Sequence, residues 1–159
     1  MTCPIATAGM LIRRPVPVVF EAFVSPSVTT LFWFTHSNGQ LEPGAEVRWT
    51  WGMYGVSTDI RVKHVEPNRR LLIDWDVETS PTEVEWTFHP HPEGTFVEIV
   101  NRGFGQGPDQ VSLAIDSAGG FALVLAAAKL WLEHGIRPAF IEDRHPDARV
   151  PEWSSPAKS

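Results

Sequence analysis

Asn101 is the polar residue whose position in the sequence points most clearly to a binding role. It follows Val97 and Ile99 at intervals of two, and side chains two residues apart share one face of a strand. Its amide is therefore expected to point inward, where a polar group without a partner costs about 1–3 kcal/mol. A neighbouring side chain, a water or a ligand must then hydrogen-bond to Asn101.

Two aspartates and one histidine have side chains suited to acid–base chemistry. Asp74 and Asp76 flank Trp75, so strand alternation predicts that both point away from its face, into solvent. If the strand bulges, one of them enters a pocket, where desolvation would raise its pKa and make it a candidate acid or base. His64 falls on the apolar face of its own strand, which favours a partly buried structural histidine over a catalytic one.

The remaining histidines and the single cysteine carry weaker signals. His89 and His91 have a spacing that can bind a metal, but they lie in a Pro-rich turn without a third ligand nearby, so no metal site is predicted. His36 follows a run of aromatic residues and is either at the mouth of a cavity or a plain loop residue. Cys3 lies in a terminus that is expected to fray, where it is poorly placed as a nucleophile. The sequence contains neither a Gly-rich phosphate loop after a strand nor a Gly-x-Ser-x-Gly elbow, and no cofactor is predicted.

The aromatic content is the unusual feature of the composition. The 159 residues include 7 Trp and 9 Phe but 1 Tyr, and rings of this size in a small domain form either a well-filled core or the wall of a pocket. The net charge is −6 and no block of Lys or Arg occurs, which argues against nucleic acid or an anionic membrane as the main partner. One cysteine and the lack of a signal-peptide pattern fit a cytoplasmic protein.

Hydrophobic periodicity predicts an α+β domain. Runs with a period of two alternate with turn residues along the middle of the chain, and short hairpin turns join antiparallel neighbours. A long helix follows and ends at Gly135, which suits a left-handed C-cap. The predicted elements are a strand at residues 5–14, short helices at 17–23 and 28–34, a loop at 35–44, strands at 47–51, 56–65, 70–76, 83–89 and 95–102, and the long helix at 111–134.

Only the long helix is large enough to cover the apolar face of the predicted sheet. We therefore expect a curved antiparallel sheet of about six strands wrapped around this C-terminal helix, with the two short helices closing one end and a cavity between sheet and helix. Segment 121–132 of the helix is apolar nearly all round, yet it is shorter than the roughly 20 residues that span a bilayer. Its side with Phe121, Leu125 and Leu132 is expected to line the cavity.

The opposite side of the helix needs a second cover. Leu123, Leu130 and Trp131 lie outside the stripe formed by Phe121, Leu125 and Leu132. Burying a leucine stabilises a protein by about 1.5–3 kcal/mol. We expect either the tail at residues 136–159 to fold back over them or a second chain to do so in a homodimer. The predicted organisation is therefore a domain at residues 1–135 followed by this tail. Gly119-Gly120 inside the helix predicts a close backbone approach or a kink at the pocket.

Four stretches in a fixed order resemble a known superfamily. They are residues 17–26 (PVVFEAFVSP), 65–71 (VEPNRRL) with Trp75, 94–104 (GTFVEIVNRGF), and 119–121 (GGF) with Leu125. Together with the order of the predicted elements, they make the chain similar to the START-like, or SRPBCC, helix-grip superfamily over residues 5–134. Within it, the sequence most resembles the bacterial proteins related to the activator of heat-shock-protein-ninety ATPase (AHSA-like proteins).

The resemblance implies a cavity for a small, largely apolar molecule. The sequence departs from the family at residues 32–34, Asn101 and Phe121, where members often carry a Trp pair, a His and a Trp. These departures affect the ligand rather than the fold. The candidate ligand-binding residues are Phe32, Trp33, Trp49, Trp51, Trp75, Trp86, Asn101, Phe104, Phe121 and Leu125.

Three functions remain open at this point. The first is binding of a small apolar molecule without chemistry, which the few inward polar groups favour. The second is a cyclase- or hydrolase-type enzyme that uses Asn101, His64 or an aspartate inside the pocket. The third is a protein-interaction module, either a stimulator of a chaperone ATPase in the stress response or a self-associating protein.

Overall fold

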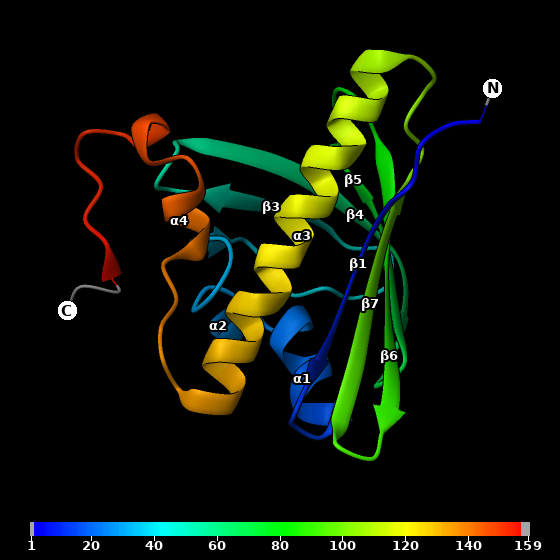
Figure 1. Ribbon diagram of the computed structural model, residues 1–159, viewed down its shortest axis with the longest axis vertical. Coiled ribbons are helices and arrows are strands. Elements are labelled where there is room, and N and C mark those ends of the chain that lie inside the picture. Colours follow the sequence, from blue (N-terminus) through cyan, green and yellow to red (C-terminus); the bar gives the residue numbers. More distant parts are fainter. Residues whose placement is uncertain (1, 157–159) are drawn as a thin grey trace.

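The strands form one antiparallel sheet that curves around a single long helix (Figure 1). The computed structural model describes residues 2–156, and over these the sheet has seven strands in the order β1-β7-β6-β5-β4-β3-β2. In chain order the elements are β1 (Ala6–Ile12), α1 (Val16–Val24), α2 (Pro26–Thr29), β2 (His36–Ser37), β3 (Glu46–Trp51), β4 (Val56–Glu66), β5 (Arg70–Trp75), β6 (Thr82–His91), β7 (Gly94–Arg102), α3 (Pro108–His134), α4 (Phe140–Arg144) and the 3₁₀ helix η1 (Pro146–Ala148). The α+β architecture predicted from the sequence is confirmed.

The strand count and one short helix differ from the prediction. The seventh strand, β2, pairs with β3 at the edge of the sheet, inside the loop predicted at residues 35–44. Two residues are too few for a period of two to be visible, so alternation could not predict this strand. Helix α2 is shorter than the predicted 28–34, because after Thr29 the chain continues as a turn in which the Trp33 N–H donates to Thr29 O at 3.0 Å.

A β-bulge in β4 changes the position of His64. The pairing of β4 with β5 is regular up to Val62, and the register then shifts before His64. An inserted residue reverses the alternation of side chains along a strand. As a result Ile60 and Val62 are buried whereas His64 is exposed, and the predicted partly buried position of His64 is wrong.

Helix α3 covers the inner face of the sheet. It packs against β1 and β7, and its N-terminal end projects beyond the strands (Figure 1). Phe121, Leu125 and Leu132 are buried, as the predicted stripe requires. The helix ends at Gly135, whose φ of 63° and ψ of 22° form the predicted left-handed cap, and the Gly135 N–H donates to Trp131 O at 2.8 Å.

By length and composition alone, α3 is also long and apolar enough to cross a membrane. It has 27 residues, and one window of 18 residues has a mean hydropathy of 1.8. Apolar residues before Phe121 belong to the same helix, so its apolar part is longer than segment 121–132 alone. Leu125, Ala127 and Ala128 belong to the core that α3 shares with the sheet. Helix α3 is therefore the core helix of this fold.

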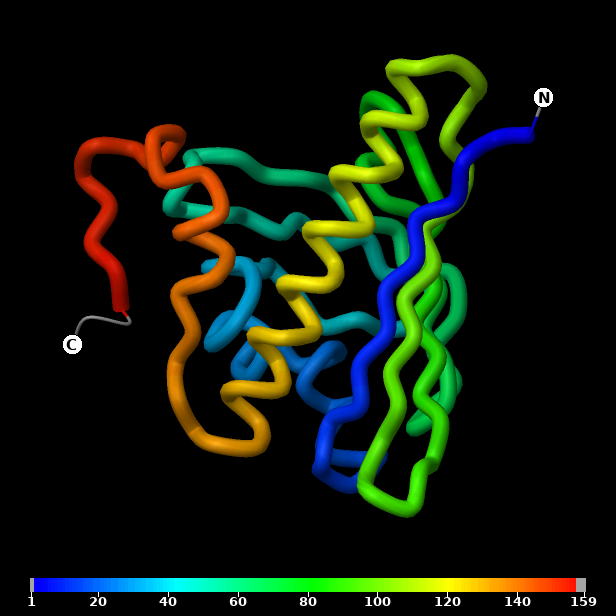
Figure 2. Tube along the Cα trace, viewed as in Figure 1, coloured from blue at the N-terminus to red at the C-terminus, as the bar shows by residue number. Residues whose placement is uncertain are grey.

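The chain after Gly135 turns back and runs beside α3 (Figure 2). Helix α4 packs against α3, and the Val150 N–H donates to Met53 O in the hairpin between β3 and β4 at 2.8 Å. Of the tail predicted at residues 136–159, the last three residues lie outside the described part of the chain. The returning segment places α4 next to the N-terminal half of α3.

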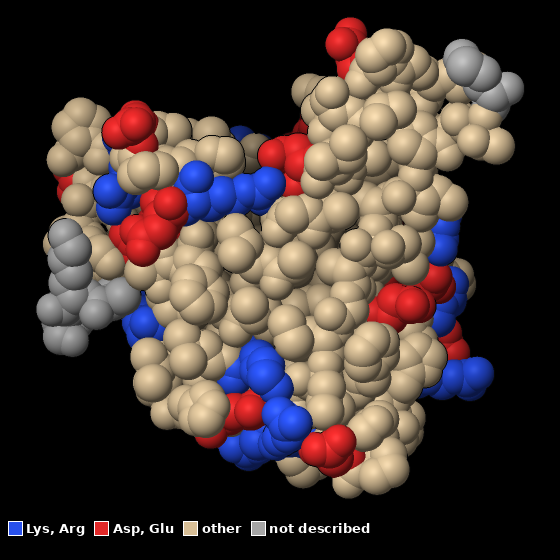
Figure 3. Space-filling model, viewed as in Figure 1, with Lys and Arg blue, Asp and Glu red and all other residues tan. Residues whose placement is uncertain are grey.

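The surface over α3 carries few charged side chains (Figure 3). Charged groups gather instead beside α4 and at the lower edge of the view. Val111, Leu113 and Ile115, in the projecting half of α3, are 44%, 53% and 68% exposed. Leu123, Leu130 and Trp131 are half-buried.

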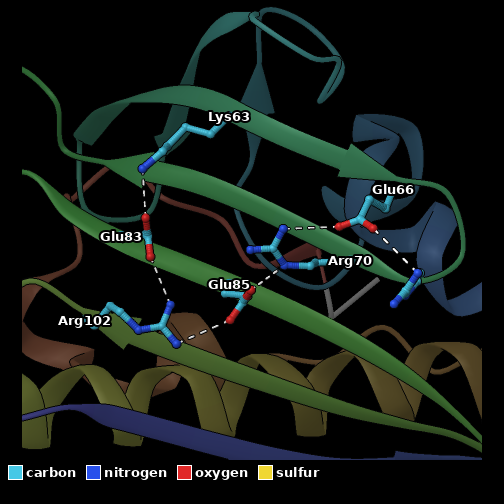
Figure 4. Close-up of polar contacts among 7 residues, drawn as sticks. Lys63, Glu66, Arg70, Glu83, Glu85 and Arg102 are labelled. Atoms are coloured by element: carbon cyan, nitrogen blue, oxygen red, sulfur yellow. Dashed lines mark hydrogen bonds and ion pairs between the residues drawn. The ribbon is translucent and has the colours of Figure 1, made fainter.

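A chain of ion pairs crosses the outer face of the sheet (Figure 4). Lys63 Nζ of β4 lies 2.8 Å from Glu83 Oε2 of β6 and 3.4 Å from Asp74 Oδ1 of β5. Glu83 Oε1 accepts a second hydrogen bond, from Arg102 of β7, at 3.0 Å. The chain continues through Glu85, Arg70, Glu66 and Arg69. Opposite charges on neighbouring strands favour this register over shifted ones.

Replacing Glu83 by Gln is expected to lower the free energy of unfolding by about 1 kcal/mol at pH 7, since exposed ion pairs contribute about 0.2–1 kcal/mol each. The hydrogen bond from Lys63, helped by the one from Arg102, holds the pKa of Glu83 below its usual value, although burial opposes this shift. The unfolded state then binds protons more readily, so the stabilisation is present above the unfolded pKa of about 4.3 and is lost as the pH falls through the folded pKa. Urea unfolding at pH 7 and pH 3 measures this difference.

Glu98→Gln is the matched control, because Glu98 is exposed on the outer face of β7. It should change the free energy of unfolding by less than about 0.5 kcal/mol. Equal losses in the two variants, or a Glu83→Gln effect that persists unchanged at pH 3, would contradict the assignment.

Candidate functional site

A cavity of about 570 Å³ opens between the inner face of the sheet and α3. Small-molecule sites in proteins have volumes of about 300–1,000 Å³. Strands β3 to β7 contribute one wall, the N-terminal half of α3 the opposite wall, and α4 one side. The lining residues are Trp33, Trp51, Tyr54, Val56, Ser57, Thr58, Trp75, Asp76, Ser80, Thr82, Asn101, Gly103, Phe104, Gln110, Leu113, Asp116, Ser117, Gly120, Phe121, Val124, Ile141, Arg144 and His145.

Four aromatic rings form the apolar wall of the cavity. Trp33 stacks on Trp75 at an interplanar angle of 21°, with 5.9 Å between the ring centroids. The Trp51 ring lies 5.8 Å from Trp75, and Phe121 meets Trp75 edge-on at 5.9 Å. Such contacts favour one arrangement of the rings. Trp33, Trp51 and Phe121 are buried, and the parts of them that remain accessible line the cavity. Phe104, from the segment between β7 and α3, adds to this lining.

The other candidate rings lie behind this wall. Trp49 and Trp86 are buried and do not line the cavity, but their centroids lie 5.0 Å from Trp33 and 6.1 Å from Phe121 respectively. Within residues 2–156 neither indole N–H has a hydrogen-bond partner. Both meet their neighbours edge-on, an arrangement in which a ring face can accept an N–H weakly. Phe32 and Leu125 are buried core residues that likewise do not line the cavity.

Asn101 points inward as predicted, and protein groups hydrogen-bond to it. Its Nδ2 donates to Glu83 O at 2.9 Å, and its Oδ1 accepts from Ser117 Oγ at 2.7 Å. The sequence left open a neighbouring side chain, a water or a ligand as the partner of Asn101. In the structure the side chain of Ser117 takes this role, together with the Glu83 carbonyl. Asn101 lines the cavity and holds Ser117 of α3 against β7, which ties the two walls together at this end.

Asp76 lines the cavity, whereas Asp74 lies beside Lys63 on the outer face. Asp76 follows the last residue of β5 and has a φ of 60°, a left-handed conformation that is uncommon outside Gly, Asn and Asp. Its Oδ1 lies 3.4 Å from Thr58 Oγ1, and its Oδ2 accepts from Thr79 Oγ1 at 2.7 Å. The prediction that both aspartates face solvent is therefore wrong for Asp76. One aspartate does line the cavity, as the alternative allowed, but the cause is the left-handed residue after the end of β5 and not a bulge within the strand.

Arg144 of α4 closes one side of the cavity. Its Nη2 donates to Asp116 O and Asp116 Oδ1, both at 2.9 Å. The guanidinium lies over Gly119 and Gly120, where a Cβ at Gly120 would come within 2.5 Å of Arg144 Nη1. The glycine pair thus permits a close approach, but the approaching group is the Arg144 side chain and not the backbone that was predicted.

Tyr54 joins the hairpin between β3 and β4 to this C-terminal segment. Its hydroxyl donates to Ile141 O and accepts the His145 N–H at 3.3 Å. Burial raises the pKa of Tyr54 above its usual value of about 10. Tyr54 therefore remains a protonated donor at neutral pH and keeps α4 at the edge of the cavity.

The remaining histidine candidates lie outside the cavity lining. His36, His64, His89 and His91 are all exposed. His36 does not line the cavity and belongs to the edge strand β2, so it is neither at a cavity mouth nor the plain loop residue of the alternative. His91 Nδ1 accepts the Glu93 N–H at 3.0 Å, a local contact within the β6–β7 turn.

Sequence reasoning missed most polar residues of the cavity edge. Leu113, Ser117 and Val124 recur at helical spacing with Phe121, so the α3 wall had a usable signal. Asp76 depends on a single backbone angle, and Arg144 depends on where a Pro-rich tail folds. Neither has a signature in a periodic pattern.

The model of the family described as Activator of Hsp90 ATPase homolog 1-like protein matches residues 13–127. The chain belongs to this family. Among curated proteins no significant match was found. The AHSA1-like match ends before α4, so the segment that carries Arg144 and His145 lies beyond the matched residues.

Solved structures show the same helix-grip fold. Protein SSP2350 from Staphylococcus saprophyticus is 25% identical, with a TM-score of 0.75 over 85% of this chain and 96% of that one. DynU16, described as a putative protein in the dynemicin biosynthetic locus, is 25% identical with a TM-score of 0.72, over 82% of this chain but 48% of DynU16. The Aha1 dimer from Colwellia psychrerythraea is 16% identical, with a TM-score of 0.73 over 83% of this chain and 98% of that one.

Glu142 fastens the C-terminal segment of this AHSA1-like protein. Its carboxylate is buried and accepts hydrogen bonds from Trp153 Nε1 and Ser155 Oγ, both at 2.6 Å. Trp153 packs against the main core near Gly52, and Ile141 does so from α4. The contacts of Glu142 therefore hold the end of the chain and the cavity edge in one arrangement.

Glu142→Ala is expected to lower the free energy of unfolding by about 2 kcal/mol, because it removes a buried charged acceptor and its hydrogen bonds from Trp153 Nε1 and Ser155 Oγ. It should also speed tryptic cleavage at Arg149, which the fastened segment protects. Thermal unfolding and limited proteolysis measure the two effects. Asp143→Ala, in the next position and exposed, is the control and should change both by little; indistinguishable variants would show that Glu142 does not fasten the segment.

Proposed function

We propose that this AHSA1-like protein binds a small, largely apolar molecule in the cavity between β3–β7 and α3. The proposal rests on the cavity itself, in which Trp33, Trp51 and Trp75 line one side and Phe121 of α3 meets them from the other. Burying apolar surface is worth roughly 25 cal/mol per Å², and aromatic rings offer a rigid surface for it. A ligand that covers these rings would gain most of its affinity there.

The polar groups sit where they can orient such a ligand. Thr58, Asp76 and Thr82 lie on the strand side of the cavity, and Ser117 lies on α3. A few placed polar groups on an apolar lining are typical of small-molecule sites, where they fix orientation. The proposed ligand therefore has an apolar ring system and at least one polar substituent.

The enzymatic alternative named Asn101, His64 or an aspartate inside the pocket. Asn101 is engaged by Ser117 and the Glu83 carbonyl, and His64 lies outside the lining. Of the two lining aspartates, Asp116 is paired with Arg144, so Asp76 is the member of this set that best suits a cyclase- or hydrolase-type reaction. DynU16, which is described as belonging to a biosynthetic locus, shares the fold and supports a role with small organic molecules. Stimulation of a chaperone ATPase and a cytoplasmic location stay predictions.

Leu113→Trp is expected to weaken binding of the neutral fluorescent probe N-phenyl-1-naphthylamine. Leu113 lines the cavity from α3 and is exposed enough to accept a larger side chain without disturbing the core. Steric overlap of about 1–3 kcal/mol would raise the Kd by about fivefold or more. Fluorescence titration of the purified protein measures the Kd.

Ser112→Trp is the matched control, since Ser112 is the exposed neighbour that does not line the cavity. It should leave the Kd within about twofold of the unmodified protein. A probe that binds both variants equally well would place its site elsewhere, and no binding to the unmodified protein would count against an open cavity.

We also infer that two chains associate through the projecting half of α3. Val111, Ile115, Ala118 and Ala122 recur at intervals of four, three and four along the helix, which places them on one stripe beside the edge strand β1. Exposed apolar stripes of this kind mark contact surfaces. The Colwellia psychrerythraea protein of this fold is described as a dimer, which supports the inference.

Ile115→Glu is expected to shift the protein toward the monomer, because a carboxylate buried in an interface without a partner is costly. The dimer dissociation constant should rise by about tenfold or more. Sedimentation velocity at several concentrations measures it. Ser112→Glu adds the same charge outside the stripe and should have a smaller effect; a monomeric unmodified protein would overturn the inference.

A further inference from the structure

The formal charges along the cavity are not balanced. Two carboxylates, Asp76 and Asp116, and one guanidinium, Arg144, line it. The lining also includes the imidazole of His145, which lies beside the Tyr54 ring at 6.0 Å. Arg144 is paired with Asp116 at 2.9 Å. Within residues 2–156, the side-chain groups that contact Asp76 are the hydroxyls of Thr58 and Thr79, and no cation pairs with it. The cavity therefore holds one carboxylate whose charge the protein does not neutralise.

The position of Asp76 is held by its backbone and by these hydroxyls. It directly follows Trp75 and turns out of β5 with a φ of 60°. Thr79 donates to Asp76 Oδ2 at 2.7 Å and holds the carboxylate, while the buried Thr58 of the neighbouring strand β4 makes a weaker contact with Oδ1 at 3.4 Å. Hydroxyl donors orient a carboxylate without removing its charge, so the charge remains available to a ligand.

The aromatic rings of the cavity favour the same kind of ligand as the Asp76 carboxylate, a cation. The face of an indole or phenyl ring carries negative electrostatic potential and attracts a cation, most strongly where water is excluded. Trp33, Trp51, Trp75 and Phe121 meet in the wall that leads to Asp76. A carboxylate in a cavity lined by aromatic rings favours a positive group on an apolar body and disfavours a negative one.

We propose that the ligand of this cavity is an organic cation, an amine whose apolar ring system lies on the tryptophan wall and whose ammonium group pairs with Asp76. This inference rests on the proposed binding function and adds the charge class of the ligand. Asp76 acts as a binding residue: it accepts a hydrogen bond from the ammonium N–H. The Arg144–Asp116 pair is already satisfied and forms the opposite edge.

Three probes with one naphthalene body separate the charge classes. We would measure binding of 1-naphthylmethylamine, 1-naphthalenemethanol and 1-naphthoate to the full chain by calorimetry at pH 7. The amine is cationic, the alcohol neutral and the carboxylate anionic. We expect the amine to bind about tenfold more tightly than the alcohol, because a hydrogen bond between charged groups is stronger than a neutral one, and the naphthoate to bind most weakly.

Asp76→Asn tests the residue itself. Asn tolerates the left-handed conformation, so the variant should keep the turn and its thermal stability. It should reduce binding of the amine to the level of the alcohol and leave the alcohol within about twofold. Glu78→Gln is the matched control, because it removes the same charge from an exposed position in the same loop that does not line the cavity, and it should change neither.

The outcomes separate this inference from the proposed function. Equal binding of the amine and the alcohol, unchanged by Asp76→Asn, would overturn the charge assignment while leaving apolar binding in place. Tighter binding of naphthoate would make Arg144 the anchor and would also overturn it. No binding of any probe would overturn both the charge assignment and the proposed function.

Discussion

The structure depends on how one straight helix packs against a curved sheet. Helix α3 contacts β1 and β7 closely, with Leu125 and Leu132 in the shared core. The sheet curves away toward β3 and β4, and the N-terminal half of α3 projects past the strands (Figure 1). Aromatic side chains fill part of the widening space, and the rest is the cavity. The same constraint leaves Val111 and Ile115 exposed, so the cavity and the apolar stripe have a common geometric origin.

The outer face of the sheet favours the strand register, and the inner face carries the candidate binding site. On the outer face, ion pairs through Lys63, Glu83 and Arg102 align neighbouring strands. The inner face carries large aromatic rings instead of charged groups, among them the buried Trp49 of β3 and Trp86 of β6. These buried rings support the wall ring Trp33 and, through Trp86, Phe121. The C-terminal segment beyond the family match then supplies the charged edge through Arg144.

The sequence predicted what periodic patterns encode and missed what depends on single residues. Alternation located six of the strands, and the helix with its Gly135 cap ends where expected. Alternation also selected the inward face, but it cannot tell a ring that touches the cavity from one behind it, so Trp49 and Trp86 entered the candidate set beside Trp51 and Trp75. A one-residue bulge moved His64 outward and one left-handed residue moved Asp76 inward, and neither event changes the local composition.

The proposed site requires that the space between α3 and the rings of Trp33, Trp51 and Trp75 is open to a ligand. A crystal structure of the protein with bound N-phenyl-1-naphthylamine examines this space. We predict electron density for the ring system inside the cavity, against Trp75 and Phe121, with these two rings still in contact as they are now. Density for Trp33 or Phe121 filling that space, with the probe elsewhere or missing, would contradict it.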